Sequence, residues 1–89
     1  MIEFEIMIAN TKGMHARASA KFVETVEAFD AKCEVTKDGI TVSGDSIMGL
    51  LMLAAAKGSF IYLKTWGPDS KLLADALTRL IANNFEEED

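Results

Sequence analysis

Residues 2–29, IEFEIMIANTKGMHARASAKFVETVEAF, decide the fold because the hydrophobic period changes within them. Apolar residues occupy every second position from Ile2 to Ile8, which is the pattern of a strand with one buried face. Turn-forming residues interrupt this pattern over Asn10–Gly13. Apolar residues then recur at helical spacing as far as about Phe29. The sequence therefore predicts a strand followed by an amphipathic helix that begins at His15.

Shorter elements are predicted along the rest of the chain. Two brief alternating runs flank Asp38-Gly39, a dipeptide suited to the tight turn of a β-hairpin. Ser46 is a good N-cap for a short helix over Ile47–Leu53. A strand over Phe60–Trp66 and a final helix complete the predicted order β-α-β-β-α-β-α.

This order indicates the α+β class. The outward positions of the predicted strands are polar, so helices are expected to cover only one face of the sheet. The same order also fits a ferredoxin-like split βαβ arrangement, and periodicity does not choose between the topologies. No repeat or linker divides the chain, so we expect a single domain over 1–89. Its acidic end, 86–89, is expected to fray because it lies at the negative end of the last helix dipole.

Composition narrows the function further. The 89 residues include 14 acidic and 9 basic side chains, and the net charge of -5 argues against nucleic acid or anionic membrane as a partner. The longest apolar run, Ile47–Ala56, is well short of the ~20 residues that span a membrane. The single Cys33 excludes an internal disulfide and fits a reducing compartment. Without a basic signal at the N-terminus, the expected location is the cytoplasm.

Metal and cofactor chemistry are not expected from this sequence. One histidine and one cysteine cannot form a His/Cys zinc site, and no acidic cluster has the spacing of a calcium loop. No nucleotide-binding glycine motif is present. A chain this small also has little volume for an enclosed substrate pocket, so a conventional metabolic enzyme is not indicated.

The segment Gly13-Met14-His15-Ala16-Arg17 is the candidate reactive site. His15 lies where a loop becomes a helix, and the first backbone N–H groups of a helix are free to bind an anion. The guanidinium of Arg17 offers a planar fork of donors for phosphate oxygens. Imidazole is a competent nucleophile toward phosphorus. The pattern suggests a histidine that accepts and releases a phosphoryl group, although a simple capping histidine has the same spacing.

A second candidate site surrounds Ser46. The serine is explained by helix capping alone, while phosphorylation there would place charge beside an apolar surface. Residues 47–53 include too many apolar side chains for one buried face, so some of them are expected to be exposed. Such a patch is either a partner surface or part of the core or a dimer contact. Cys33 is expected to be a buried apolar residue and not a nucleophile.

Nearly the whole chain resembles the family of HPr, the histidine-containing phosphocarrier of the bacterial phosphoenolpyruvate-dependent phosphotransferase system. The resemblance is carried by Gly13-Met14-His15-Ala16-Arg17, by Ser46 before a short apolar helix, and by the order of elements. It implies an open-faced β-sandwich with four antiparallel strands under three helices. It also implies a stoichiometric phosphotransfer protein without a cofactor, and not a conventional turnover enzyme.

The resemblance also implies roles for individual residues. His15 would carry the phosphoryl group on Nδ1, with Arg17 and the backbone of Ala16 and Arg17 holding the phosphate. Enzyme I would be the donor and a IIA-type protein the acceptor. Ser46 would be the target of a regulatory kinase and phosphorylase. The docking face would consist of Ala20, Ile47, Met48, Leu51 and Met52.

Several positions depart from the family pattern. Ala18 replaces the usual proline, and alanine preserves the helix while releasing the fixed φ of proline. Glu24 and Glu27 stand where sugar-transport carriers often have basic residues, and Gly49 replaces a frequent lysine. These changes suggest different partners, such as those of the nitrogen-related or a regulatory branch of the system.

A hypothesis of another class stays open from the sequence. In it, the chain is a regulatory interaction module that Ser46 phosphorylation controls, and His15 is incidental.

Overall fold

The structure is a computed structural model that describes residues 1–87. The elements follow the predicted order β-α-β-β-α-β-α, with a short 3₁₀ helix after the last α-helix. They are β1 (Ile2–Met7), α1 (Ala16–Glu27), β2 (Lys32–Lys37), β3 (Ile40–Ser43), α2 (Ile47–Met52), β4 (Phe60–Trp66), α3 (Ser70–Ala82) and η1 (Asn84–Glu86).

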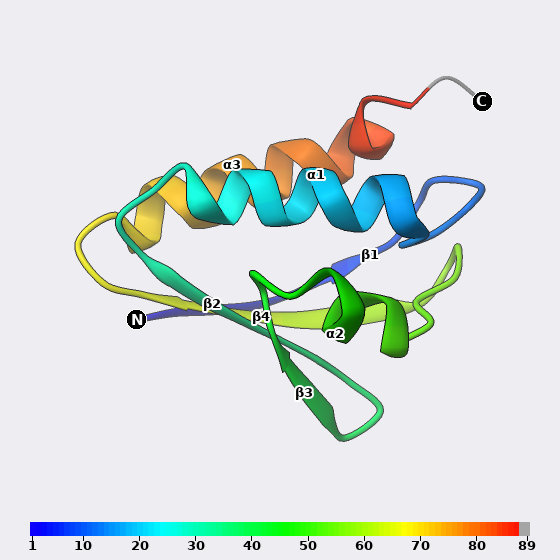
Figure 1. Cartoon of the computed structure of the whole chain (residues 1–89), viewed down its shortest axis with the longest axis horizontal. Helices are drawn as coiled ribbons and strands as arrows, with labels where there is room; N and C mark the ends of the chain where they lie inside the picture. Colours follow the sequence, from blue (N-terminus) through cyan, green and yellow to red (C-terminus); the bar gives the residue numbers. More distant parts are fainter. Residues whose placement is uncertain (88–89) are drawn as a thin grey trace.

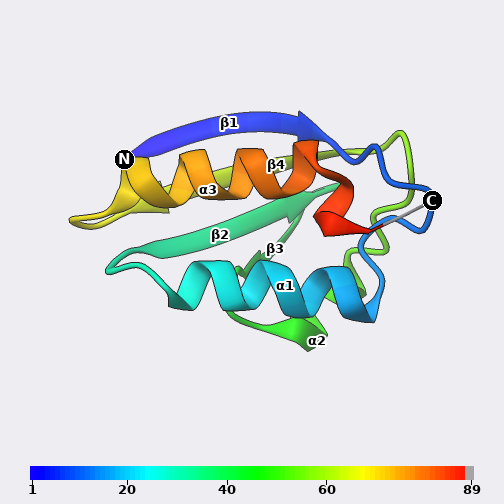
Figure 2. The same cartoon turned by 90° about the horizontal axis from the view of Figure 1, so that it is seen from above.

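The four strands form one sheet in the order β1-β4-β2-β3, and every neighbouring pair is antiparallel. Helices α1 and α3 run side by side across one face of the sheet, and α2 packs beside α1 next to β3 (Figures 1 and 2). Among residues 1–87, no helix covers the opposite face (Figure 1). This arrangement confirms the open-faced β-sandwich and places β4 and β2 at its centre.

The core lies between the sheet and the helices, as the two hydrophobic periods predict. Along β4, Ile61, Leu63 and Thr65 are buried while the residues between them are more exposed. Helices α1 and α3 each contribute an apolar stripe, since residues three and four positions apart share a helix face. The largest fully buried side chains on these two helices are Phe22, Leu73, Leu77 and Ile81.

One turn and one helix cap confirm local predictions. Asp38 and Gly39 have φ values of 51° and 80°, the paired positive angles of a type I′ hairpin turn. Ser46 is the N-cap of α2, and its Oγ accepts the N–H of Gly49 at 3.0 Å. Helix α2 ends at Met52, so the predicted last residue, Leu53, is its C-cap.

The C-terminal end turns back toward the start of α1 (Figure 2). Phe85 is fully buried, and Lys21 on α1 donates a hydrogen bond to its carbonyl at 2.9 Å. Glu86 contacts Lys21, and Glu87 contacts His15. The sequence predicts a free end for these two residues instead. The rest of the predicted frayed segment, 88–89, lies outside the described residues.

Candidate functional site

A tight loop between β1 and α1 presents the candidate histidine. Gly13 has a φ of 64°, and a side-chain Cβ built there would lie 2.4 Å from the carbonyl oxygen of Ala55. The next residue, Met14, donates its backbone N–H to that same oxygen at 2.9 Å. The chain that follows α2 therefore holds the loop, and only glycine fits at position 13.

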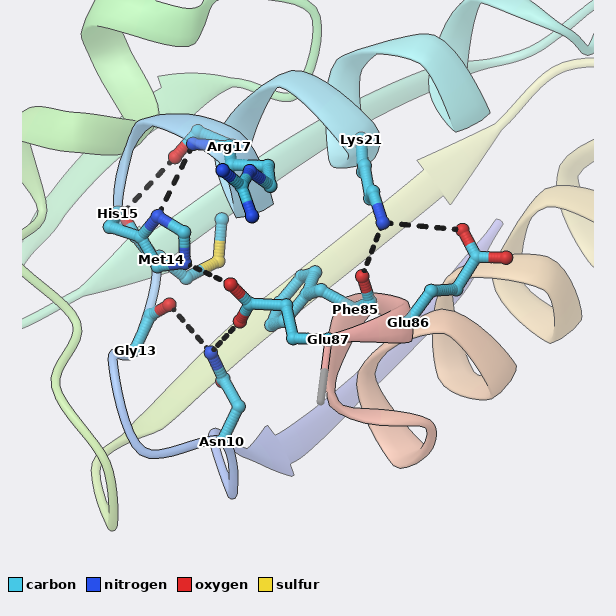
Figure 3. Close-up of polar contacts among 10 residues, drawn as sticks. Asn10, Gly13, Met14, His15, Arg17, Lys21, Phe85, Glu86 and Glu87 are labelled. Atoms are coloured by element: carbon cyan, nitrogen blue, oxygen red, sulfur yellow. Dashed lines mark hydrogen bonds and ion pairs between the residues drawn. The ribbon is translucent and has the colours of Figure 1, made fainter. Parts of the chain in front are cut away.

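His15 is the N-cap residue of α1, as predicted, and its ring performs the capping. Its backbone is extended, and Nδ1 accepts the N–H of Arg17 at 3.3 Å (Figure 3). Its carbonyl oxygen accepts the N–H of Ser19 at 2.8 Å, which starts the helix. The side chain is 28% exposed, so its ring is partly open to a partner.

The first turn of α1 presents positive charge beside His15. Ala16 and Arg17 are exposed, and no acidic side chain lies in this turn. Within residues 1–87, the guanidinium of Arg17 makes no hydrogen bond or ion pair. The helix dipole and the backbone donors at this end favour a bound anion. The structure therefore brings together His15, Ala16 and Arg17, the three predicted phosphate-site residues.

The other ring nitrogen of His15 contacts a carboxylate from the far end of the chain. Nε2 lies 2.5 Å from Oε2 of Glu87, whose side chain is only 7% exposed. The second carboxylate oxygen accepts Nδ2 of Asn10 at 2.9 Å, and Nδ2 also donates to the carbonyl of Gly13 at 2.8 Å (Figure 3). An ionised carboxylate only accepts hydrogen bonds, so Nε2 carries the ring proton and Nδ1 the lone pair.

Opposing effects act on the carboxyl group of Glu87. Burial raises its pKa, and this is the largest single effect. Hydrogen bonds from His15 and Asn10, together with electrostatic attraction by His15 and Lys12, more than offset it. The net result is a pKa below the ordinary value of 4.5. Glu87 is therefore ionised near neutral pH.

Sequence reasoning missed Asn10 and Glu87 as members of this site. The sequence predicts Asn10 only as a turn residue, whereas its side chain is fully buried and bridges the loop to the C-terminal segment. For Glu87 the sequence predicts only a free acidic end. No local pattern predicts either contact, because Asn10 and Glu87 are separated by 77 positions.

The residues expected to dock a partner lie mostly on α2. Ile47, Met48 and Met52 are exposed, by 41%, 71% and 71%, while Leu51 and Ala20 are partly buried. This confirms that some apolar side chains of α2 face outward. Ser46 is half-buried at the start of this helix, with its Oγ engaged in capping.

Other kinds of site receive no support from the described part of the chain. Over residues 1–87, no group of three His, Cys, Asp or Glu side chains is arranged to hold a metal ion. No described helix has the length and apolar character needed to cross a bilayer. A hollow of about 560 Å³ lies between the end of α1 and strands β2 and β3, and it contains none of the site residues.

Comparisons with known proteins agree with this geometry. The family model described as "PTS HPr component phosphorylation site" matches residues 2–83. The phosphocarrier protein HPr of Neisseria meningitidis serogroup A is 49% identical over 98% of each chain, and that of Cupriavidus necator is 44% identical over the same shares. A crystal structure of HPr from Thermoanaerobacter tengcongensis superimposes with a TM-score of 0.94 at 38% identity and covers 100% of both chains.

The fold and these matches define a phosphocarrier protein of the bacterial phosphotransferase system. The chain belongs to the HPr family.

Proposed function

We propose that His15 is the residue that carries the phosphoryl group and that Nδ1 is the atom to which it is bound. This proposal rests on one observation, which is the pair of contacts made by the His15 ring. Nε2 donates to Glu87, and the lone pair of Nδ1 faces the backbone N–H of Arg17. The basic nitrogen thus lies at the anion-binding end of α1, where a transferred phosphoryl group meets donors at once.

The transfer follows from this arrangement. The lone pair of Nδ1 attacks phosphorus in line, and the bond between phosphorus and the donor's phosphorylated side chain breaks with its electron pair retained by the donor. The N–H of Arg17, which in the unphosphorylated protein donates to Nδ1 at 3.3 Å, is then in place to donate to a phosphoryl oxygen. The Arg17 guanidinium neutralises further charge. Positioning and charge stabilisation account for the chemistry that the chain supplies.

The partners are proposed from the family and from the exposed surface. Enzyme I, charged by phosphoenolpyruvate, is the donor, and a IIA-type protein is the acceptor, both acting in the cytoplasm. The docking face consists of Ala20, Ile47, Met48, Leu51 and Met52. The three most exposed of them, Ile47, Met48 and Met52, lie at the two ends of α2. Exposed apolar side chains of this kind suit a partner surface, and methionine adapts to several partners.

Ser46 is proposed as a regulatory phosphorylation site next to this docking face. A phosphoryl group on Oγ would bring about two negative charges beside Ile47 and Met48. Affinity for Enzyme I should fall, because this charge enters an apolar contact. Ser46→Asp, measured by isothermal titration against Enzyme I, is expected to bind more weakly than Ser46→Asn, which tests the charge while keeping a capping side chain. Equal affinity of the two variants would contradict the regulatory role.

The acidic face of α1 bears on the choice of acceptor. Glu24 and Glu27 are exposed and would repel a partner with an acidic surface around its own histidine. We therefore propose the nitrogen-related or a regulatory branch as the setting. Transfer to a IIA protein of the nitrogen-related branch is expected to be faster than transfer to a sugar-branch IIA protein. The reverse order would contradict this assignment.

The test of the carrier role uses phosphoenolpyruvate and Enzyme I from the same organism, with the intact mass of the protein as readout. The expected result is one phosphoryl group that acid treatment removes and that His15→Ala lacks. Arg17→Ala, as a second variant, should accept the group more slowly but retain it at the same residue. No mass increase with an active Enzyme I would overturn the proposal.

A further inference from the structure

The contact between Glu87 and His15 differs from an ordinary solvent-exposed ion pair. The carboxylate comes from a residue 72 positions away, and the side chain that carries it is only 7% exposed. Burial of a carboxylate is unfavourable unless hydrogen-bond donors or cations surround it. Here the ring of His15 and the amide of Asn10 supply those donors. The site therefore contains a carboxylate that the fold has specifically placed.

The backbone that delivers Glu87 is itself in an unusual conformation. Asn84, Phe85 and Glu86 have φ values of 54°, 56° and 62°, so three successive residues adopt the left-handed region and none is glycine. Such residues persist only where surrounding contacts hold them. The buried ring of Phe85 and the hydrogen bond from Lys21 to its carbonyl provide those contacts. They return the chain to the start of α1 instead of letting α3 continue outward.

Asn10 completes the arrangement. Its side chain is fully buried, and Nδ2 donates both to the loop carbonyl of Gly13 and to Glu87. Its Oδ1 has no hydrogen-bond partner among the described residues, which is an unfavourable state for a buried carbonyl oxygen. The two bonds of Nδ2 therefore fix the orientation of the amide. Through this one amide, the loop that carries His15 is tied to the carboxylate that contacts its ring.

We propose that Glu87 is a positioning residue for phosphoryl transfer, an inference that rests on the function proposed above. By accepting the N–H of Nε2, Glu87 keeps the ring proton on that nitrogen and the lone pair on Nδ1. When Nδ1 bonds to phosphorus, the ring keeps its Nε2–H and gains a positive charge, which Glu87 faces directly. During onward transfer, the electron pair of the N–P bond returns to Nδ1 and the ring is neutral again. No proton leaves Nε2 in either direction.

The experiment compares Glu87→Gln and Glu87→Ala with Glu86→Gln. The control removes the neighbouring carboxylate, which is 69% exposed and pairs only loosely with Lys21 at 3.8 Å. Single-turnover transfer from phosphorylated Enzyme I is followed by rapid quench. Both Glu87 variants are expected to be slower by about fivefold, the value of a charge-assisted hydrogen bond that is weakened because the His15 side chain is 28% exposed. The Glu86 variant should match the wild type.

A spectroscopic readout separates positioning from a merely structural role. In the neutral ring of ¹⁵N-labelled protein, Nε2 should give the signature of a protonated nitrogen in the wild type and in Glu86→Gln. The amide of Glu87→Gln can donate as well as accept, so the proton should be shared between the two ring nitrogens in that variant.

The outcomes distinguish this inference from the proposed function. If both Glu87 variants transfer at the wild-type rate and the ring proton stays on Nε2, the positioning role is wrong. Phosphorylation of His15 in the same experiment would still support the carrier role. Absence of phosphorylation in the wild type would overturn both. Slower transfer by both variants, with the altered proton distribution in Glu87→Gln, would support the inference.

Discussion

Replacement of Gly13 by alanine tests how the histidine loop is held. Gly13 has a φ of 64°, which is unfavourable for alanine by about 1 kcal/mol. The added Cβ would also lie 2.4 Å from the Ala55 oxygen and 2.9 Å from Cα of Ala56, both backbone atoms that move only with the chain. Overpacking of this kind costs about 1–3 kcal/mol. Together, the two effects predict a loss of about 3 kcal/mol from the free energy of unfolding.

Gly39→Ala is a matched control for this change. Gly39 has a φ of 80°, but among the described residues no heavy atom beyond Gly39 and its two chain neighbours lies within 4 Å of the position of its Cβ. Gly39→Ala should therefore lower the free energy of unfolding only through the unfavourable φ, by about 1 kcal/mol. The difference of about 2 kcal/mol between the variants isolates the contact with Ala55.

Urea unfolding followed by circular dichroism measures both losses. A destabilisation of about 3 kcal/mol corresponds to a fall in Tm of about 12–24 °C for a chain of this size. Equal losses in Gly13→Ala and Gly39→Ala would refute the reasoning, since the close approach to Ala55 would then have no energetic consequence.

Three further predictions concern Ser46, Cys33 and Glu87. Ser46→Ala should lower the free energy of unfolding by about 1 kcal/mol in urea titration, because the cap of α2 is lost; an unchanged midpoint would contradict the capping role. Burial, with the charges of Glu34 and Asp45, raises the pKa of Cys33 to about 12, so alkylation detected by mass should require unfolding; rapid labelling of the native protein at pH 8 would show otherwise. The lowered pKa of Glu87 means that its stabilisation is present above about pH 4.5 and is lost as pH falls through the folded pKa. The stability difference between wild type and Glu87→Gln should accordingly be largest near pH 7 and should shrink as the pH falls below 4.5; a difference independent of pH would contradict the pairing.

Local periodicity was sufficient to predict most of the fold. The alternation in β1 and the helical spacing in α1 each follow from one buried face, so both elements are visible in the sequence. Asp38-Gly39 predicts its hairpin because few other dipeptides accept two positive φ angles. The order of the strands in the sheet could not be predicted from periodicity, because it depends on contacts between elements. The family resemblance, and not periodicity, indicated the open-faced β-sandwich.

The candidate site was predictable only in part. His15 and Arg17 follow from their position at a helix start, which a local pattern reveals. Glu87 does not, since a charge argument alone predicts that acidic residues leave the negative end of α3. The reversal through Asn84, Phe85 and Glu86 lacks a glycine or proline signal. It is stabilised by tertiary contacts of Phe85 and Lys21 that no local pattern encodes.

The most direct test of the central claim is to identify the atom that carries the phosphoryl group. The protein, labelled with ¹⁵N in its histidine ring, is phosphorylated by Enzyme I and phosphoenolpyruvate, and coupling between ³¹P and each ring nitrogen is measured by NMR. The account predicts one phosphoryl group coupled to Nδ1 of His15, with Nε2 protonated. Coupling to Nε2, or a phosphoryl group on any other residue, would contradict it.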